Sequence, residues 1–269
     1  MTSGGLIPFY YISGDPRHDL GIVSTTVQNL RPHVDEIVVV DDGTGIICLP
    51  DVRLISHEKN KGKAQSIRTG INILLERPDI ENIVEIDADN EQDPNETPKL
   101  LEYLYGKVGP TLILGNRYTA PQMVDSGSYC DRIRRLQQYV WGEMEFQLSD
   151  GVTGFRAYNR AFALAIAEQS VSNGFGIATE QLAIAAIIGA QVYEVPLAYA
   201  RRRKNFTPAV KLNEVLGGIL CHKKRLLKGG FLSLIEVLEL IEKQLTSRKE
   251  IISIGDLEFT KRGNNYTSR

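Results

Sequence analysis

The sequence predicts an α/β protein built on a mostly parallel sheet with helices on both faces. Short apolar runs alternate five times with segments of helical periodicity before residue 115, and this alternation is typical of a parallel sheet. The chain has 269 residues, which fits one large domain of this class. Acidic residues also follow directly after two of the apolar runs, and ligands of open α/β sheets gather at the carboxyl ends of strands.

Each predicted strand is a short run rich in apolar residues. The expected strands are Leu6–Ile12, Glu36–Val40, Val52–Ser56, Ile83–Ile86, Thr111–Leu114 and Val192–Pro196. Helices are expected at Leu20–Leu30, through Ile67 and Leu75, and at Glu96–Tyr105, Tyr129–Leu148, Ala157–Gln169, Glu180–Ile188 and Phe231–Leu245. We expect Gly151–Arg156 and Asn173–Ala178 to be glycine-rich loops, and the polar tail after Arg262 to be disordered.

Composition excludes several classes of protein. The net charge of −2 indicates no general affinity for nucleic acid. The three cysteines, Cys48, Cys130 and Cys221, lie far apart and fit neither a disulfide framework nor a zinc motif, so a reducing cytoplasm is the simplest setting. The first residues contain neither a basic start nor a long apolar core, and no apolar run approaches 18 residues. We therefore expect neither a signal peptide nor a membrane span.

A cluster of carboxylates follows the strand predicted at Ile83–Ile86. Asp87, Asp89, Glu91 and Asp93 are four acids within seven residues. Because like charges repel, folding here is costly unless the acids share a cation. Mg²⁺ or Mn²⁺ can offset this repulsion and can also bind a diphosphate. The alternative is an acidic turn that only caps the helix after it.

Seven segments of the chain together carry a family resemblance, and they occur in this order: IVVVDDGT (37–44), NKGKAQSIRTG (60–70), EIDADNEQDPNETPKLL (85–101), LGNRY (114–118), SDGVTGFRAYNR (149–160), GFGIATE (174–180) and EVPLAYARR (194–202). The set resembles the family 2 glycosyltransferases, and within them the dolichyl-phosphate (polyprenyl-phosphate) mannosyl- and glucosyltransferases. The resemblance covers roughly residues 6 to 210 and implies a GT-A fold, which is a Rossmann-like sheet with helices on both faces. It also implies a nucleotide-sugar donor of the GDP-mannose or UDP-glucose type, a divalent metal, an inverting transfer and a polyprenyl phosphate acceptor.

The resemblance assigns one group of residues to the nucleotide. Asp41 and Asp42 match acids that hold the base or ribose, and turn capping is the alternative for them. Pro8 and Tyr10 match a Pro-x-Tyr in which the aromatic ring lies against the base. The Asn-Glu that follows in the family is replaced by Tyr11-Ile12, so the resemblance does not fix the base.

A second group is assigned to the diphosphate and its metal. Asp87, Ala88 and Asp89 match the metal-binding Asp-x-Asp, and Glu91 stands where the family usually has a third ligand, Gln. Two cations belong to the same group: Lys63 and Arg68 lie in and after a glycine-containing loop, where they can neutralise phosphates. A solvated helix face is the alternative for Arg68.

The acceptor side is assigned by the same resemblance. Arg117, Arg135 and Arg202 match arginines that can form an anion pocket for a phosphate. For Arg135 and Arg202 the alternative is a surface charge in a basic run. Asp150 is a candidate catalytic base, although a phosphate acceptor needs none, so orienting the sugar or holding the glycine-rich loop is equally open. Glu180 matches a glutamate at a helix start, where it can anchor arginine side chains or a sugar hydroxyl, or cap the helix.

We expect a GT-A domain over residues 1–228, followed by an amphipathic helix and a polar tail over residues 229–269. The segment Ala200–Gly229 is strongly basic. This segment and the helix expected at Phe231–Leu245 could together hold a cytoplasmic protein at an anionic membrane face. Packing or homodimerisation is the alternative for that helix. Transfer to a soluble or glycan acceptor, and non-catalytic nucleotide-sugar binding, both stay open as functions.

Overall fold

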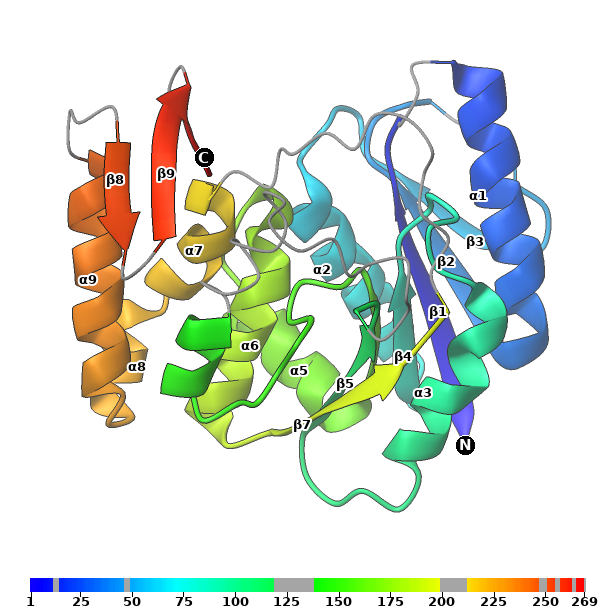
Figure 1. Ribbon diagram of the computed structural model, residues 1–269. Coiled ribbons are helices and arrows are strands. Elements are labelled where there is room, and N and C mark those ends of the chain that lie inside the picture. Colours follow the sequence, from blue (N-terminus) through cyan, green and yellow to red (C-terminus); the bar gives the residue numbers. More distant parts are fainter. Residues whose placement is uncertain are drawn as a thin grey trace.

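A seven-stranded sheet forms the centre of the described chain in the computed structural model (Figure 1). The structure describes residues 1–11, 15–45, 49–118, 138–198, 212–246, 251–254, 257–262 and 265–268. Its strands are β1 (Thr2–Phe9), β2 (Glu36–Asp41), β3 (Arg53–Ser56), β4 (Ile80–Ile86), β5 (Thr111–Asn116), β6 (Phe155–Asn159) and β7 (Gln191–Pro196). The spatial order is β3-β2-β1-β4-β6-β5-β7. The predicted α/β class is confirmed.

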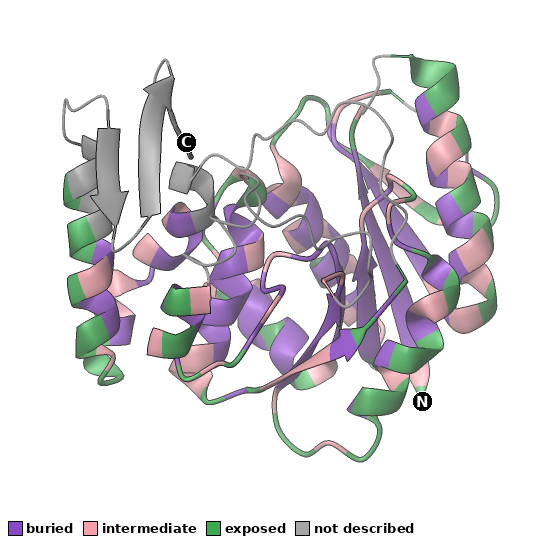
Figure 2. Cartoon of the chain, in the orientation of Figure 1, coloured by how far each residue is buried: buried purple, intermediate pink, exposed green. Residues whose placement is uncertain are grey.

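Helices cover both faces of the sheet, as the sequence predicts (Figure 1). One face carries α1 (Pro16–Leu30) and α3 (Thr97–Leu104), and the other carries α2 (Lys63–Leu75), α5 (Arg160–Gln169) and α6 (Ile177–Ile188). The cause is the alternation of side chains along each strand: Leu6 packs with α2, whereas its neighbour Ile7 packs with α1. Both faces are therefore apolar, and the five inner strands are buried almost throughout, whereas the edge strands β3 and β7 are mostly half-buried or exposed (Figure 2).

Strand β6 corrects the sequence prediction, which placed a loop at Gly151–Arg156 and the start of a helix at Ala157. β6 is instead paired antiparallel with both β4 and β5, and α5 begins only at Arg160. The prediction was wrong because Arg156 interrupts the apolar pattern of a five-residue strand. Arg156 is nevertheless fully buried, since its guanidinium is satisfied by hydrogen bonds inside the protein.

The strand directions bring four carboxyl ends to one edge of the sheet. β1 is parallel to β2 and β4, and because β4 and β5 are both antiparallel to β6, they are parallel to each other. Two strand spacings separate β4 from β5, which is about 10 Å. Residues that follow β1, β2, β4 and β5 therefore lie along the same edge.

The chain after the sheet forms three helices and a small antiparallel sheet. These elements are α7 (Leu212–Leu220), α8 (Lys223–Lys228), α9 (Leu232–Thr246), β8 (Ile251–Ile254), β9 (Leu257–Arg262) and β10 (Asn265–Ser268). The predicted amphipathic helix is confirmed as α9, whose Leu234, Ile235 and Leu238 are buried in the same core cluster as α6. The tail predicted to be disordered contains β10, which pairs with β9. Within the described residues, no helix combines the length and apolar character needed to cross a bilayer.

Short 3₁₀ segments and one shortened helix complete the fold. The segments are η1 (Arg31–His33), η2 (Pro94–Glu96) and η4 (Gly174–Gly176). The helix predicted at Tyr129–Leu148 lies partly outside the described residues. Within them, residues 138–143 are helical, and the chain turns at Glu145, whose φ is 64°. The helix therefore ends earlier than its apolar pattern suggests.

Replacement of Gly70 by alanine should destabilise the protein. A Cβ at Gly70 would lie 2.0 Å from Cδ1 of Leu6, which is fully buried, so α2 would be pushed off β1. Overpacking of this kind costs roughly 1–3 kcal/mol, measurable by urea denaturation. Gly21→Ala in α1 is the control: a Cβ there meets no heavy atom within 4 Å, so stability should be unchanged or slightly higher. Equal effects of the two substitutions would contradict close packing at Gly70.

Candidate functional site at the carboxyl edge of the sheet

The predicted site residues that fall in the described ranges gather mainly at one edge of the sheet. Pro8 is buried near the end of β1, Tyr10 is 47% exposed just after it, and Asp41 and Asp42 end β2. Asp87 follows β4, and Arg117 follows β5. Arg135 and Arg202 lie outside the described residues, so their assignment to an acceptor pocket stays a prediction.

Asp41 and Asp42 are buried, and their carboxylates shape the loops around them. Asp41 accepts hydrogen bonds from the backbone N–H of Thr44 at 2.9 Å and of Gly45 at 3.0 Å. Asp42 Oδ1 lies 2.8 Å from His57 Nδ1, and its two oxygens accept from Lys61 N and Gly62 N, each at 2.8 Å. These contacts show turn capping, which is the alternative that the sequence left open. Contact with a base or ribose stays a prediction.

Asp87 and Lys63 form an ion pair at the centre of the edge. Lys63 Nζ lies 2.5 Å from Asp87 Oδ1, and the side chains are 17% and 30% exposed. Gly154 makes room for the acid, because a Cβ there would lie 2.0 Å from Asp87 Oδ2. Lys63 is the first residue of α2, whose N-cap Gly62 provides no side-chain cap. A helix N-terminus beside a lysine is a suitable environment for phosphate.

The acids fit a hard divalent cation by their donor chemistry. Asp87 and Asp89 offer carboxylate oxygens, which Mg²⁺ and Mn²⁺ prefer. Asp89 Oδ1 also accepts a hydrogen bond from Glu91 N at 3.0 Å. Asp87, Asp89 and Glu91 do not converge as a set of three ligand atoms within 4.8 Å of one another in the described structure. The assignment of Glu91 as a third ligand therefore stays a prediction.

Asp150 holds Arg117 rather than facing solvent. Arg117 Nε and Nη2 donate to the two oxygens of Asp150 at 2.6 and 2.7 Å, and the backbone N–H of Arg117 donates at 3.1 Å. Asp150 is only 1% exposed. A bidentate, charge-assisted pair of this kind fixes both position and orientation of the guanidinium. In this structure the carboxylate of Asp150 orients Arg117, and its roles as a catalytic base or toward the sugar stay predictions.

Glu194, which the sequence analysis missed, fixes the chain at Asp150. Its Oε1 accepts from Ser149 N at 2.8 Å and from Asp150 N at 2.5 Å, and Asn116 Nδ2 donates to Oε2 at 3.2 Å. Burial raises the pKa of Glu194, and the hydrogen bonds from the two backbone N–H groups oppose this only in part. Glu194 begins the segment EVPLAYARR, but no sequence pattern connects it to Asp150.

A buried polar network, which the sequence did not predict, lies behind the edge. Arg156 donates to Thr153 O, Gly151 O and Ala178 O at 2.8–2.9 Å. It also donates to Gln181 Oε1 at 2.9 Å, and Gln181 in turn donates to Glu85 at 3.0 Å. Burial raises the pKa of Glu85, while the charge of Arg156, its partner across the β4–β6 pair, opposes that shift. The network holds the loop that carries Gly154 beneath Asp87.

Arg68 and Glu180 both serve the connection between α5 and α6. Arg68 Nη1 donates to Ser172 O at 2.7 Å and to Ser170 Oγ at 3.1 Å. Glu180 is fully buried and accepts from the backbone N–H groups of Val171 and Ser172. Burial opposes its ionisation, but hydrogen bonds from His222 and the two serines outweigh burial and lower the pKa of Glu180 to about 2. Neither contact set involves the edge acids, and the phosphate role of Arg68 stays a prediction.

The fold and the edge together define a class of protein. An antiparallel strand inserted beside β4, with acids at the carboxyl end of β4, is the arrangement of a GT-A glycosyltransferase. The chain belongs to glycosyl transferase family 2, whose sequence profile matches residues 18–166. The family resemblance found in the sequence is therefore confirmed.

Known proteins similar to this chain agree with that assignment. An undecaprenyl-phosphate mannosyltransferase of Micrococcus luteus is 27% identical over 198 residues, which cover 66% of this chain and 77% of that protein. Glucosyl-3-phosphoglycerate synthase from Mycobacterium tuberculosis, in complex with Mn²⁺, UDP-glucose and phosphoglyceric acid, has a TM-score of 0.58 at 17% identity, covering 85% of this chain and 80% of that chain. The crystal structure of a mycobacterial protein has a TM-score of 0.57 at 15% identity, covering 100% and 83%. The two structures share the fold.

Glu194→Gln should cost more stability at pH 5 than at pH 7. Because the pKa of Glu194 is raised in the folded protein, the folded state binds more protons than the unfolded state near that pKa. The wild-type protein therefore gains stability from this group as the pH falls, and glutamine, which does not titrate, cannot follow. Urea denaturation of both proteins at the two pH values gives the difference. A loss that is equal at both pH values, or larger at pH 7, would contradict the raised pKa.

Proposed function

We propose that this family 2 glycosyltransferase moves a hexose, mannose or glucose, from a nucleoside-diphosphate sugar to a polyprenyl phosphate. The observation that carries the proposal is the placement of Asp87, Lys63 and Arg117 along one edge of the sheet. The similarity to the undecaprenyl-phosphate mannosyltransferase supports the choice of acceptor.

The donor diphosphate is proposed to lie between the N-terminus of α2 and the acids after β4. The N–H groups at the start of α2 and the ammonium group of Lys63 favour an anion there. Asp87 and Asp89 would hold Mg²⁺ or Mn²⁺, which when bound offsets the negative charge of the leaving nucleoside diphosphate. Asp41 and Asp42 keep the neighbouring loops in place beside this position. Tyr10, exposed after β1, is available to lie against the base.

The acceptor side depends on Arg117. Its guanidinium is oriented by Asp150 about two strand spacings from the acids, so it can bind an anion close to the donor. Burial and pairing leave Asp150 poorly placed to remove a proton from an acceptor hydroxyl. A phosphate acceptor is already ionised at neutral pH and needs no such base. The burial of Asp150 therefore favours an acceptor phosphate over an acceptor alcohol.

A peripheral contact with an anionic membrane surface is part of the proposal, since the acceptor is a lipid. The apolar face of α9 is covered by the core, so the contact would use α8 and the turn after it. Lys224 and Lys228 are exposed there, and Leu227 and Leu232 are 43% and 61% exposed beside them. Basic and apolar side chains together are typical of surfaces that bind anionic lipids.

Removal of the carboxylate of Asp89 should abolish metal-dependent binding of a nucleoside diphosphate while the fold is kept. Asp89 is half-buried in a cluster of like charges, so its loss should not destabilise the metal-free protein. Asp93→Ala is the matched control, because it removes the same charge from an exposed position that caps η2. Calorimetric titration with GDP and UDP, with Mn²⁺ and with a chelator, measures the effect. Equal metal-dependent affinity in both variants would refute the assignment of the metal to Asp89.

The acceptor is tested by transfer from labelled GDP-mannose and UDP-glucose. The purified full chain should place the sugar on a short polyprenyl phosphate dispersed in detergent, giving a product that partitions into organic solvent. The same reactions with phosphoglyceric acid and with simple glycosides test the soluble-acceptor alternative. Transfer only to a water-soluble acceptor would refute the lipid-phosphate proposal, and donor binding without transfer to any acceptor would favour a non-catalytic protein.

A further inference from the structure

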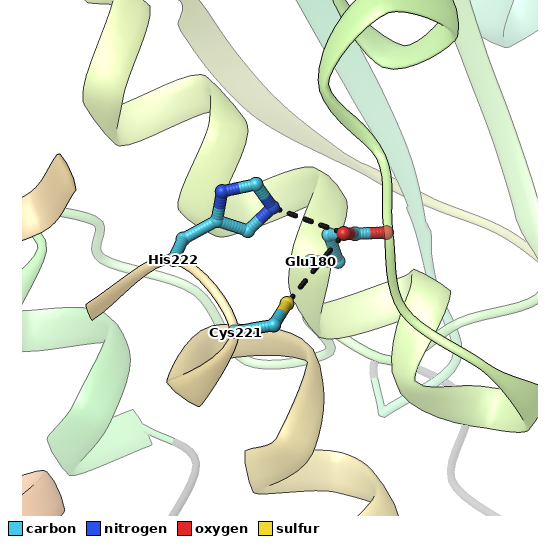
Figure 3. Close-up of side chains that lie close together, drawn as sticks. All are labelled: Glu180, Cys221 and His222. Carbon is cyan, nitrogen blue, oxygen red and sulfur yellow. Dashed lines mark hydrogen bonds and ion pairs between the residues drawn. The ribbon is translucent and has the colours of Figure 1, made fainter. Parts of the chain in front are cut away.

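Three potential metal ligands converge away from the acids of β4. Glu180 lies in the first turn of α6, and Cys221 and His222 form the corner between α7 and α8 (Figure 3). His222 Nε2 lies 3.0 Å from Glu180 Oε1, and Cys221 Sγ lies 3.6 Å from the same oxygen. All three ligand atoms fall within 4.8 Å of one another. Glu180 and His222 are buried, whereas Cys221 is exposed.

The carboxylate of Glu180 has more donors than it can accept well. Its Oε1 already receives the N–H groups of Val171 at 2.6 Å and Ser172 at 3.0 Å, before His222 and Cys221 are counted. Its Oε2 receives the hydroxyls of Ser170 and Ser172 at 2.5 and 2.6 Å. Six donors thus converge on two oxygens that offer about four lone-pair sites. Four of these donors share Oε1, and one divalent cation in place of the protons of His222 and Cys221 would lower the number of groups on Oε1 from four to three.

We propose that Glu180, Cys221 and His222 form a binding site for Zn²⁺. A thiol, an imidazole and a carboxylate are the ligand types of tetrahedral zinc, with a water molecule in the fourth position on the exposed side of Cys221. On binding, the thiol proton of Cys221 leaves to solvent, and His222 keeps its single proton on Nδ1 while Nε2 binds the ion. One thiolate and one carboxylate balance the charge of Zn²⁺, so the buried site is neutral overall.

The ion would fasten the C-terminal helices to the catalytic part of the chain. Gly218 of α7 packs so closely on α6 that a Cβ there would lie 2.0 Å from Gly176 O and 2.8 Å from Glu180 N. Gly176 belongs to η4, whose Phe175 has Lys63 Nζ 5.7 Å from its ring centre. Zinc at the corner of α7 and α8 would therefore stabilise the position of η4 beside the proposed phosphate site. The site differs in chemistry from Asp87 and Asp89, which provide only oxygen.

The test is metal binding by the full-length chain after treatment with a chelator. Titration with Zn²⁺ against a chromophoric competitor should show one tight site per chain, weakened at least tenfold in Cys221→Ser. Asp89→Ala should keep the tight site, because it removes a carboxylate only from the acids after β4. Co²⁺ in place of Zn²⁺ should give a thiolate-to-metal charge-transfer band in the near ultraviolet.

A second variant keeps the test decisive if Cys221→Ser does not fold. Cys48→Ser/Cys130→Ser leaves Cys221 as the sole cysteine of the chain, so the cobalt charge-transfer band must persist in it. Loss of the band in this double variant, absence of a tight Zn²⁺ site in the wild-type protein, or equal Zn²⁺ affinity in folded Cys221→Ser would each overturn the proposal. Those results would make the three residues a hydrogen-bonded cluster only. A persistent band together with a weakened site in Cys221→Ser supports zinc.

Discussion

The buried guanidinium of Arg156 is the interaction on which the catalytic edge depends. It donates hydrogen bonds to the backbone carbonyl groups of Gly151 and Thr153 in the loop before β6, and of Ala178 in the first turn of α6. A buried charge of this kind is tolerated only where its hydrogen bonds are satisfied, and removal of a partner costs several kcal/mol. Because Gly154 lies in the same loop and beneath Asp87, the position of the proposed metal ligand is coupled to Arg156 through the backbone.

Carboxylates at the edge have two different roles: some fix loops, and others are proposed to bind a ligand. Asp42 and Glu194 are buried and accept backbone N–H groups, so they fix loops. Asp87 and Asp89 are half-buried, and Asp87 pairs with Lys63, so these two acids are the ones proposed to meet the donor. Asp150 connects the two kinds, since its own N–H is held by Glu194 while its carboxylate orients Arg117. Burial separates the supporting acids from those proposed to bind the donor.

Much of the fold could be predicted from sequence because the parallel strands are uniform apolar runs. β2 and β4 end in acids, and that pattern located the edge and most of the proposed site. β6 could not be predicted, because a charged residue occupies the second position of a five-residue strand and only the tertiary structure shows how Arg156 is satisfied. The same limit applies to Glu194, and to Cys221 and His222, which meet Glu180 from 41 and 42 positions away. Local spacing rules for metal ligands do not detect such a set.

The insertion of β6 between β4 and β5 has a consequence for synthesis of the chain. Phe155 leaves the ribosome 69 residues after Ile86, and at typical elongation rates this takes on the order of 3–14 s. Until then the hydrogen-bonding groups along one side of β4 have no strand beside them, and an unpaired apolar strand edge readily joins other chains. The nascent chain therefore passes through an interval in which its central strand is exposed to aggregation. Chaperones that shield the half-finished sheet would be most useful between the emergence of these two strands.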